Sequence, residues 1–226
     1  MRNATAVLIA LLTAASGPAR IITVDDDNPA DFNNIQAAIV DSNDGDVIVV
    51  AEGTYFENIN FKSKNITLRS TDPNNPDVIA ATVIDGNNLG SVVTFAGTED
   101  ETCVLAGFTV QNGKVDYGAG ISGSEPAGTN PTHATIQNNI ITRNVARWDG
   151  GGLFCCNGTI QNNVITNNLA GAGGGGLAYC DGVIQNNIVT NNSAIQWYGC
   201  GGGLYNCNGT IQNNTIFGNS ANHRGG

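Results

Sequence analysis

The chain has 226 residues, a formal net charge of -10, 12% charged residues and 30 glycines. This length suits one elongated domain, and the shortage of basic residues excludes a stripe that could release phosphate counterions, so no nucleic-acid partner is expected. Of the 19 acidic residues, 15 precede Thr102 and four follow it. The negative charge therefore belongs to the N-terminal half of the chain.

Residues 1–19 have the pattern of a secretory signal peptide. Arg2 precedes an apolar stretch from Ala6 to Leu12, and small residues follow from Ala15 to Ala19. The apolar stretch is too short to cross a membrane as a helix, so we expect no transmembrane segment. The mature chain is predicted to be secreted or displayed at the cell surface.

Residues 20–62 are predicted to form an N-terminal strand, a capping helix and a first coil. The strand begins at Ile21 and the helix runs from Asp31 to Asp41, with Asp31 as its N-cap. One face of this helix is apolar, with Phe32, Ile35 and Ile39. Such a helix can cover the open end of a stack of strands, which otherwise exposes unpaired backbone.

Residues 63–226 contain a repeated unit. The string Ile-Gln-Asn-Asn begins at Ile136, Ile160, Ile184 and Ile211, so successive copies are 24, 24 and 27 residues apart. A period of this length without a helical pattern predicts stacked coils of short strands. The apolar pairs expected to face inward are Ile160/Ile165, Ile184/Val189 and Ile211/Ile216.

Two columns of asparagines follow these apolar positions. One column is Asn163, Asn187 and Asn214, and the other is Asn168, Asn192 and Asn219. Asparagine tolerates the left-handed backbone conformation, and its amide can bond to the amide of the next coil. The columns therefore predict bends between strands and a structural role.

The six cysteines divide into a column and three outliers. The column is Cys156, Cys180 and Cys207, and the outliers are Cys103, Cys155 and Cys200. Stacking at about 4.8 Å brings neighbouring Cα atoms within disulfide range, but three residues in one column cannot all pair. A ladder of small buried thiols is favoured, with one or two disulfides as the alternative. The spacing is the coil period and does not indicate a zinc site.

Four further segments complete the pattern: Gly45–Tyr55, Lys64–Ser70, Val83–Gly86 and Gly107–Gly113. Together with the repeats they resemble the secreted right-handed parallel β-helix proteins of the pectin-lyase-like superfamily. The resemblance covers nearly all of the mature chain. It implies an all-β, right-handed parallel β-helix solenoid of three sheets and about six to seven coils of ~24 residues. The superfamily includes lyases, hydrolases, esterases, epimerases and adhesins, so the resemblance selects no activity.

A variable segment precedes each glycine run and forms the candidate binding edge. Loops on a rigid scaffold commonly carry function, and flat rings flanked by amide and guanidinium groups suit the faces and hydroxyls of sugars. Trp148 and Trp197 are expected two coils apart, with a low step at Gly171 and Ala172 between them. The alternative is that the rings shield the glycine backbone. The candidate polysaccharide-binding residues are Tyr117, Arg147, Trp148, Asp149, Gln196, Trp197, Tyr198 and His223.

The sequence assigns no catalytic residue. Glycoside hydrolysis needs two carboxylates about 5–10 Å apart across one bond. After Pro131 the acidic residues are Asp149 and Asp181, which are expected on different edges of the coil. The signature strings of pectate lyases, polygalacturonases, pectin methylesterases and alginate epimerases do not occur, and Arg147 with Asp149 is interpreted as a surface ion pair. If the chain is an enzyme, the resemblance implies a polysaccharide lyase or glycoside hydrolase.

No cofactor and no metal site are predicted. The run from Asp25 to Asp27 offers carboxylates of the kind that calcium prefers, but a solvated acidic turn is the favoured interpretation.

Three functions are consistent with the sequence. The first is a secreted or surface β-helix that binds an extended polysaccharide along its loop edge. The second is a structural or adhesive solenoid spacer. The third is a lyase or hydrolase whose active site lies in coils beyond Gly226, where we expect the solenoid to continue and a surface-attachment region to follow. Exposure of Trp148 and Trp197 would favour the first function, and burial of these rings would favour the second.

Overall fold

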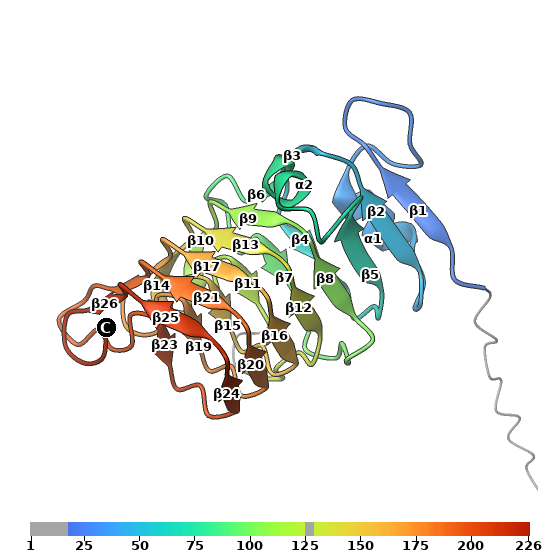
Figure 1. The fold of residues 1–226 in the computed structure, drawn as a ribbon. Helices are drawn as coiled ribbons and strands as arrows, with labels where there is room; N and C mark the ends of the chain where they lie inside the picture. The colour runs from blue at the N-terminus through green and yellow to red at the C-terminus, as the bar shows by residue number, and fades with distance from the viewer. Residues whose placement is uncertain (1–17, 125–128) are drawn as a thin grey trace, which may run out of the picture.

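The computed structural model describes residues 18–124 and 129–226. Its paired strands are parallel and stack into a solenoid that runs from β1 at one end to β24–β26 at the other (Figure 1). Two of its sheets hold eight and seven strands, which corresponds to about seven coils, so the predicted parallel β-solenoid is confirmed. The predicted signal peptide, residues 1–19, lies outside the described residues except for its last two.

Each coil passes through the sheets in a fixed order. The first sheet comprises β1 (Ile21–Val24), β2 (Val47–Val50), β5 (Thr67–Ser70), β8 (Val104–Ala106), β12 (Thr135–Gln137), β16 (Thr159–Gln161), β20 (Val183–Gln185) and β24 (Thr210–Gln212). The second sheet comprises β3 (Gly53–Phe56), β6 (Thr82–Asp85), β9 (Thr109–Gln111), β13 (Ile140–Thr142), β17 (Val164–Thr166), β21 (Ile188–Thr190) and β25 (Thr215–Phe217).

Two further sheets complete the coil. The edge sheet comprises β10 (Lys114–Tyr117), β14 (Val145–Asp149), β18 (Leu169–Ala170), β22 (Ser193–Ala194) and β26 (Ser220–Ala221). The closing sheet comprises β4 (Ile59–Asn60), β7 (Val93–Thr94), β11 (Ile121–Ser122), β15 (Leu153–Phe154), β19 (Leu177–Ala178) and β23 (Leu204–Tyr205). The expectation of three sheets was therefore wrong. Backbone pairing continues past the second bend, so part of the predicted variable loop is a five-stranded sheet.

In the repeated coils the core is mainly a column of aliphatic side chains that point inward, and in the earlier coils it also contains the buried rings of Phe61, Phe95 and Phe108. Ile160, Ile165, Ile184 and Val189 are completely buried, as the repeat pattern predicts. The last predicted pair differs, because Ile211 and Ile216 belong to the final described coil and remain 42% and 45% exposed. Burial in a solenoid depends on a neighbouring coil, so equivalent residues differ according to their place in the stack.

Two ladders of asparagines, buried except for their half-buried members in the last described coil, mark the bends on either side of the second sheet. The first consists of Asn139, Asn163, Asn187 and Asn214, and the second of Asn144, Asn168, Asn192 and Asn219. Asn168 illustrates the pattern. Its Nδ2 donates to the Ile141 carbonyl of the preceding coil (2.8 Å) and to Oδ1 of Asn192 in the next coil (3.0 Å). Its Oδ1 accepts from the backbone and side-chain amides of Asn144 (3.1 and 3.0 Å).

The left-handed conformation falls on the residue before each ladder asparagine. Asn162 and Asn167 both have φ of 56°, whereas Asn163 and Asn168 are absent from the residues with positive φ. The prediction that the column asparagines themselves adopt this conformation was therefore wrong, because it falls on the preceding residue, an asparagine or, before Asn219, Gly218. The first asparagine turns the chain, and the second uses its buried amide to join the coils.

The N-terminal helix is shorter than predicted. Helix α1 (Ile35–Asp41) begins after Asn34, whose side chain accepts a hydrogen bond from the Ala37 amide. Asp31 is not the N-cap, because its carboxylate accepts from the backbone amide and the hydroxyl of Thr23 (both 2.8 Å). Phe32 is held in an extended conformation by pairing with Val24, which delays the helix.

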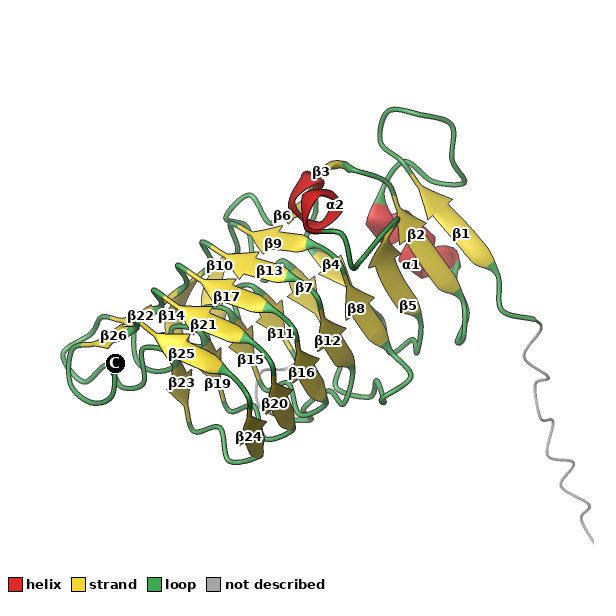
Figure 2. Cartoon of the chain, viewed as in Figure 1, coloured by secondary structure: helices red, strands yellow, loops and turns green. Residues whose placement is uncertain are grey.

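Both helices lie toward the N-terminal half of the solenoid (Figure 2). Helix α1 contacts β1, β2 and β4, and the side chains of Ile35 and Ile39 are buried there as predicted. The proposed capping role of α1 stays a prediction. Helix α2 (Pro76–Ala81), which the sequence analysis did not predict, begins after Asn75 and packs against β6 and β9.

The predicted thiol column is present. Cys156 and Cys180 are completely buried free thiols, and Cys207 in the last of the three coils is a half-buried free thiol. Each thiol donates to a backbone carbonyl two residues earlier, at 3.4–3.5 Å. The ladder of small buried thiols is thus confirmed over the alternative of disulfides within this column.

The asparagine ladder predicts a specific pattern of stability. Replacing Asn168 with alanine removes the partner of two buried backbone groups, the Ile141 carbonyl and the Asn144 amide, at about 1–3 kcal/mol each, so we expect the free energy of unfolding to fall by about 2–5 kcal/mol. Gln161→Ala is the matched control, because its amide also bonds to neighbouring coils but lies on the outer face and is only half-buried. We expect the control to lose less than about 1 kcal/mol. Urea unfolding measures both, and equal losses would contradict a dominant role for the ladder.

Candidate functional site

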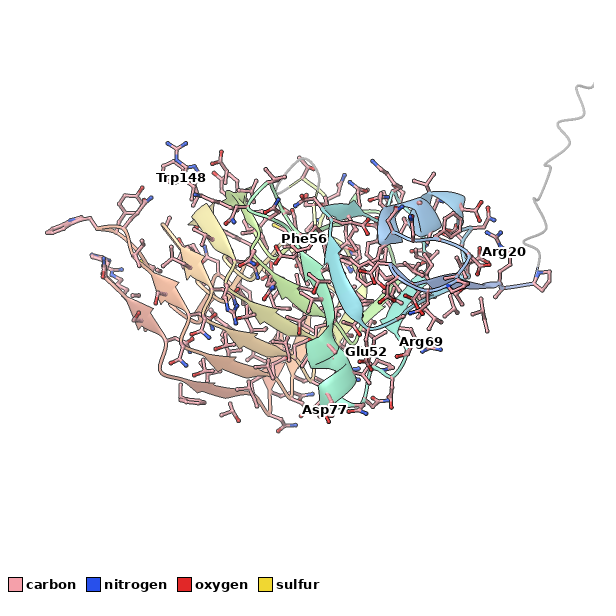
Figure 3. All side chains as sticks on the ribbon, turned by 90° about the horizontal axis from the view of Figure 1, so that it is seen from above. Arg20, Glu52, Phe56, Arg69, Asp77 and Trp148 are labelled. Carbon is pink, nitrogen blue, oxygen red and sulfur yellow. The ribbon has the colours of Figure 1, made fainter. Side chains whose placement is uncertain are left out.

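The candidate binding edge is formed by the edge sheet and the segments that follow its strands. Strand β14 carries Arg147, Trp148 and Asp149, and the segment after β22 carries Gln196, Trp197 and Tyr198. The strands β14, β18 and β22 are successive neighbours, so the two tryptophans belong to coils two steps apart, as predicted. Figure 3 shows Trp148 projecting outward from this edge of the solenoid.

Trp148 is partly covered by a neighbouring cation. The guanidinium carbon of Arg147 lies 5.0 Å from the centre of the Trp148 ring, which is within the range of a cation–π contact. Arg147 also lies 4.0 Å from the carboxylate of Asp116 in the preceding coil. Both charged groups are more than half exposed, so this ion pair adds little to stability.

The predicted ion pair between Arg147 and Asp149 is replaced by this contact with Asp116 in the described structure. The reason is geometric. Side chains two positions apart on one strand are separated by about 6.6 Å, whereas neighbouring strands are about 4.8 Å apart. A register shift between Val115 and Tyr117 accompanies the pairing of β10 with β14 near this contact.

The segment Ile195–Tyr198 is the most exposed apolar part of the edge. The exposed fractions are 49% for Ile195, 91% for Trp197 and 53% for Tyr198. Large apolar side chains that cluster on a surface commonly mark an interaction site. The three extra residues of the longest repeat fall within this region, so the insertion presents rings to solvent without disturbing the pairing of the coils.

A low step separates Trp148 from this segment, as predicted. Other atoms pack closely against Gly171. A Cβ placed on it would lie 2.0 Å from the Arg147 carbonyl oxygen and 2.5 Å from Nε2 of Gln196. Gln196 uses this space, because its side-chain amide donates to the Arg147 carbonyl oxygen two coils away (3.2 Å). Gln196 thus connects the two parts of the candidate edge across Gly171.

A row of packed aromatic rings lies beside the edge. The ring centres of Tyr117 and Phe154 are 5.3 Å apart, and those of Phe154–Tyr179 and Tyr179–Tyr205 are both 5.6 Å apart. Ala178 stands in register between Phe154 and Tyr205 and leaves room that the Tyr179 ring fills. This row shields the glycine backbone, since a Cβ at Gly173 would lie 2.3 Å from Cδ1 of Tyr205.

The shielding role therefore belongs to this row and not to Trp197, whereas Trp148 is half-buried. Of the predicted site residues, Tyr117 is part of the row, whereas Trp197 and Tyr198 face solvent. The sequence analysis missed Phe154, Tyr179 and Tyr205 as a group. The sequence pattern that marks them is an aromatic residue one or two positions after Leu153, Leu177 and Leu204. Because this spacing changes from one position to two between coils, the three rings do not stand out as one column in the sequence.

A hollow of about 280 Å³ opens at one end of the aromatic row. Hydroxyl groups, one carboxylate and one aromatic ring surround it, and its lining residues are Ser91, Thr94, Val115, Asp116, Tyr117, Ser122 and Ser124. The candidate edge thus combines exposed rings with hydroxyl, amide and guanidinium groups along several coils.

Asp149 occupies a less polar place than its neighbours. Partial burial raises the pKa of its carboxyl group above the usual value, and a hydrogen bond from the Gly173 backbone amide opposes that shift.

The remaining predicted residue, His223, follows β26 and is exposed, and its Nδ1 lies 3.8 Å from the Cys200 thiol.

The acidic run Asp25–Asp27 lies at the opposite end of the chain from the edge. Its ligand atoms lie within 4.8 Å of one another, and it is the only group of three or more potential metal ligands in residues 18–124 and 129–226. A hydrogen bond from the Asp27 backbone amide lowers the pKa of Asp25, and a side-chain hydrogen bond with Asp25 raises the pKa of Asp27. Asp26 and Asp27 are exposed and Asp25 is half-buried.

Comparison of the chain with protein-family models and with curated proteins finds no match. Across the described residues, no helix has the length and apolar character needed to span a bilayer.

The two classes of aromatic residue predict different effects on stability. Trp197→Ala should change the free energy of unfolding by no more than about 0.5 kcal/mol, because the ring is 91% exposed. Tyr179→Ala should lower it by about 1–3 kcal/mol, because that ring packs between Phe154 and Tyr205. Urea unfolding of both variants checks the assignment. A large loss in Trp197→Ala would show that this ring packs against the protein.

The position of Asp149 predicts a pH effect. Because its pKa is raised in the folded protein, the unfolded state loses this proton first as pH increases. The free energy of unfolding of wild type should therefore fall relative to that of Asp149→Asn as pH rises. The fall should begin below the ordinary aspartate pKa and end above the raised pKa of Asp149, where the difference between the two proteins becomes constant. Carboxyl ¹³C NMR gives the titration midpoint, and unfolding at several pH values gives the stability difference. A midpoint below the ordinary value would contradict the prediction.

Proposed function

We propose that the chain is an exported, right-handed parallel β-helix protein of the pectin-lyase-like type that binds an extended polysaccharide along its candidate edge. The observation that supports this proposal best is the 91% exposure of Trp197 beside the half-exposed Tyr198. Keeping such rings in water has an energetic cost unless they meet a partner. Aromatic faces suit the apolar faces of sugar rings, and Trp and Tyr also keep a polar group for hydroxyls.

The shape of the edge favours a long ligand. Arg147 and Trp148 lie on one coil, and Trp197 and Tyr198 follow two coils later along the same stack. At about 4.8 Å per coil, this separation is near 10 Å, which is comparable to the length of two sugar units. A chain lying along the solenoid would therefore meet both groups, with Gln196 crossing the low step between them.

The chemistry of the edge fits binding better than cleavage. Asp149 and Asp116 are the carboxylates near the two aromatic groups, and Asp116 is engaged by Arg147. The Arg147 guanidinium, which lies over the Trp148 ring, can bond to hydroxyls or to the carboxylates of an acidic polysaccharide. We therefore propose recognition of a polymer, without assigning a catalytic step to these residues.

The proposal is tested by affinity electrophoresis through gels that contain neutral or acidic polysaccharides of plant, algal or bacterial origin, with and without calcium. Wild type should be retarded in at least one gel. The double variant Trp148→Ala/Trp197→Ala should bind that polymer at least about tenfold more weakly, a change of about 1.4 kcal/mol, while its unfolding midpoint stays close to that of wild type.

Phe56→Ala is the matched control. Phe56 is an aromatic residue that is 69% exposed, and Figure 3 shows it apart from Trp148. Its removal should leave retardation unchanged. Equal weakening in the control and in the double variant would show that any exposed ring supports the binding, which would contradict a specific edge.

A protein-binding solenoid is the second candidate, and the 49% exposed aliphatic side chain of Ile195 favours it. Aliphatic groups contribute less to sugar recognition than aromatic rings do but are common at the centres of protein interfaces. Free migration of wild type in every gel would overturn the polysaccharide proposal and leave this candidate.

A further inference from the structure

A thiol and an imidazole face each other on the last two coils of the edge. Sγ of Cys200 lies 3.8 Å from Nδ1 of His223. Backbone contacts fix both segments: the His223 amide donates to the Gly199 carbonyl (2.9 Å), and the Gly201 amide donates to the Arg224 carbonyl (2.8 Å). The two side chains therefore meet because the coils are in register.

We propose that Cys200 and His223 form a reactive thiol–imidazole pair through which this edge forms a mixed disulfide with a disulfide-containing partner. The proposal is independent of polysaccharide binding. It names a modification site that uses a different ligand chemistry on the same edge.

The reaction is a thiol–disulfide exchange. His223 Nδ1 takes the proton from the Cys200 thiol, and the resulting thiolate attacks one sulfur of the partner disulfide. A bond forms between Sγ and that sulfur while the original S–S bond breaks. The second partner sulfur leaves as a thiolate and receives the proton from His223. No external oxidant is needed, because one disulfide replaces another.

Basic side chains surround Cys200. Arg224 is in register with Cys200 on the adjacent coil, so a cationic residue accompanies the imidazole. The acidic residue of the same column, Asp149, is two coils away, with Gly173 between. The Tyr198 carbonyl oxygen lies 3.3 Å from Sγ and can accept a hydrogen bond but cannot take the proton. Reactive cysteines are typically found in such electropositive and partly exposed places.

Other thiols of the chain lie in unreactive surroundings. Cys103 and Cys180 are completely buried, and burial raises the pKa of both thiols. Cys207 is half-buried like Cys200, but its contact with the Cys180 thiol, together with burial, raises its pKa. Cys200 differs because its neighbour is a base at the surface.

The same two groups could also contribute to a metal site. A stable zinc site needs about four donors in tetrahedral geometry. Cys200 and His223 are not part of a larger group of potential ligands in the described structure. The pair therefore fits covalent sulfur chemistry better than metal binding.

The test follows the release of thionitrobenzoate when the reduced protein reacts with 5,5′-dithiobis(2-nitrobenzoate) between pH 6 and 9. Wild type should show one fast phase, and peptide mapping should place the adduct on Cys200. Cys200→Ser should remove the fast phase. Cys207→Ser, which replaces the other half-buried thiol of these last coils, should retain it.

His223→Gln isolates the role of the imidazole. Without the imidazole a smaller fraction of the thiol is present as thiolate, which slows the reaction. Each remaining thiolate is more nucleophilic, which partly offsets that loss, so the rate at pH 7 should drop about threefold to tenfold. The pH of half-maximal rate should rise by about one unit. Circular dichroism and the unfolding midpoint of each variant show that folding is retained. A fast phase that survives Cys200→Ser, or a pH profile that His223→Gln leaves unchanged, would overturn the proposal.

Discussion

The buried amide ladders fix the register of the repeated coils that carry them. Each ladder asparagine satisfies its donors and acceptors only when it faces the asparagine of the next coil, as Asn163 does with Asn187. Slipping one coil by a residue would leave buried polar groups without partners and turn the aliphatic row outward. Fixed register places residues of equivalent position above one another. The edge, the aromatic row and the thiol column all follow from this constraint.

Much of the fold could be predicted from the repeats, because period and burial pattern are local properties of the sequence. Ile160 and Asn163 occupy the core and ladder places that their spacing indicates. The fourth sheet could not be foreseen, since strands such as β18 and β22 have only two residues and depend on pairing with neighbours. The helix start also depended on a distant contact, the pairing of Phe32 with Val24.

The candidate site was predicted only as a set of positions. Sequence spacing placed Trp148 and Trp197 on one edge, but exposure depends on what neighbouring coils supply. The rings of Phe154 and Tyr205 cover the glycine backbone because Ala178 and Gly173 leave space for them. The partner of Arg147 likewise came from the adjacent coil, where Asp116 is closer than a residue two positions along its own strand. Contacts between coils, which follow no local pattern, separate packing residues from surface residues here.

The placement of the two tryptophans separates the optical signal of the protein from its core. Both tryptophans of the chain belong to the edge, one under a guanidinium and one almost fully in water, while the core is built of aliphatic side chains, phenylalanines and small residues. Intrinsic tryptophan fluorescence therefore reports the environment of the edge and is nearly blind to the packing between coils. Quenching or a spectral shift on adding a partner can be read as an event at the edge, and loss of the solenoid must be followed by another probe.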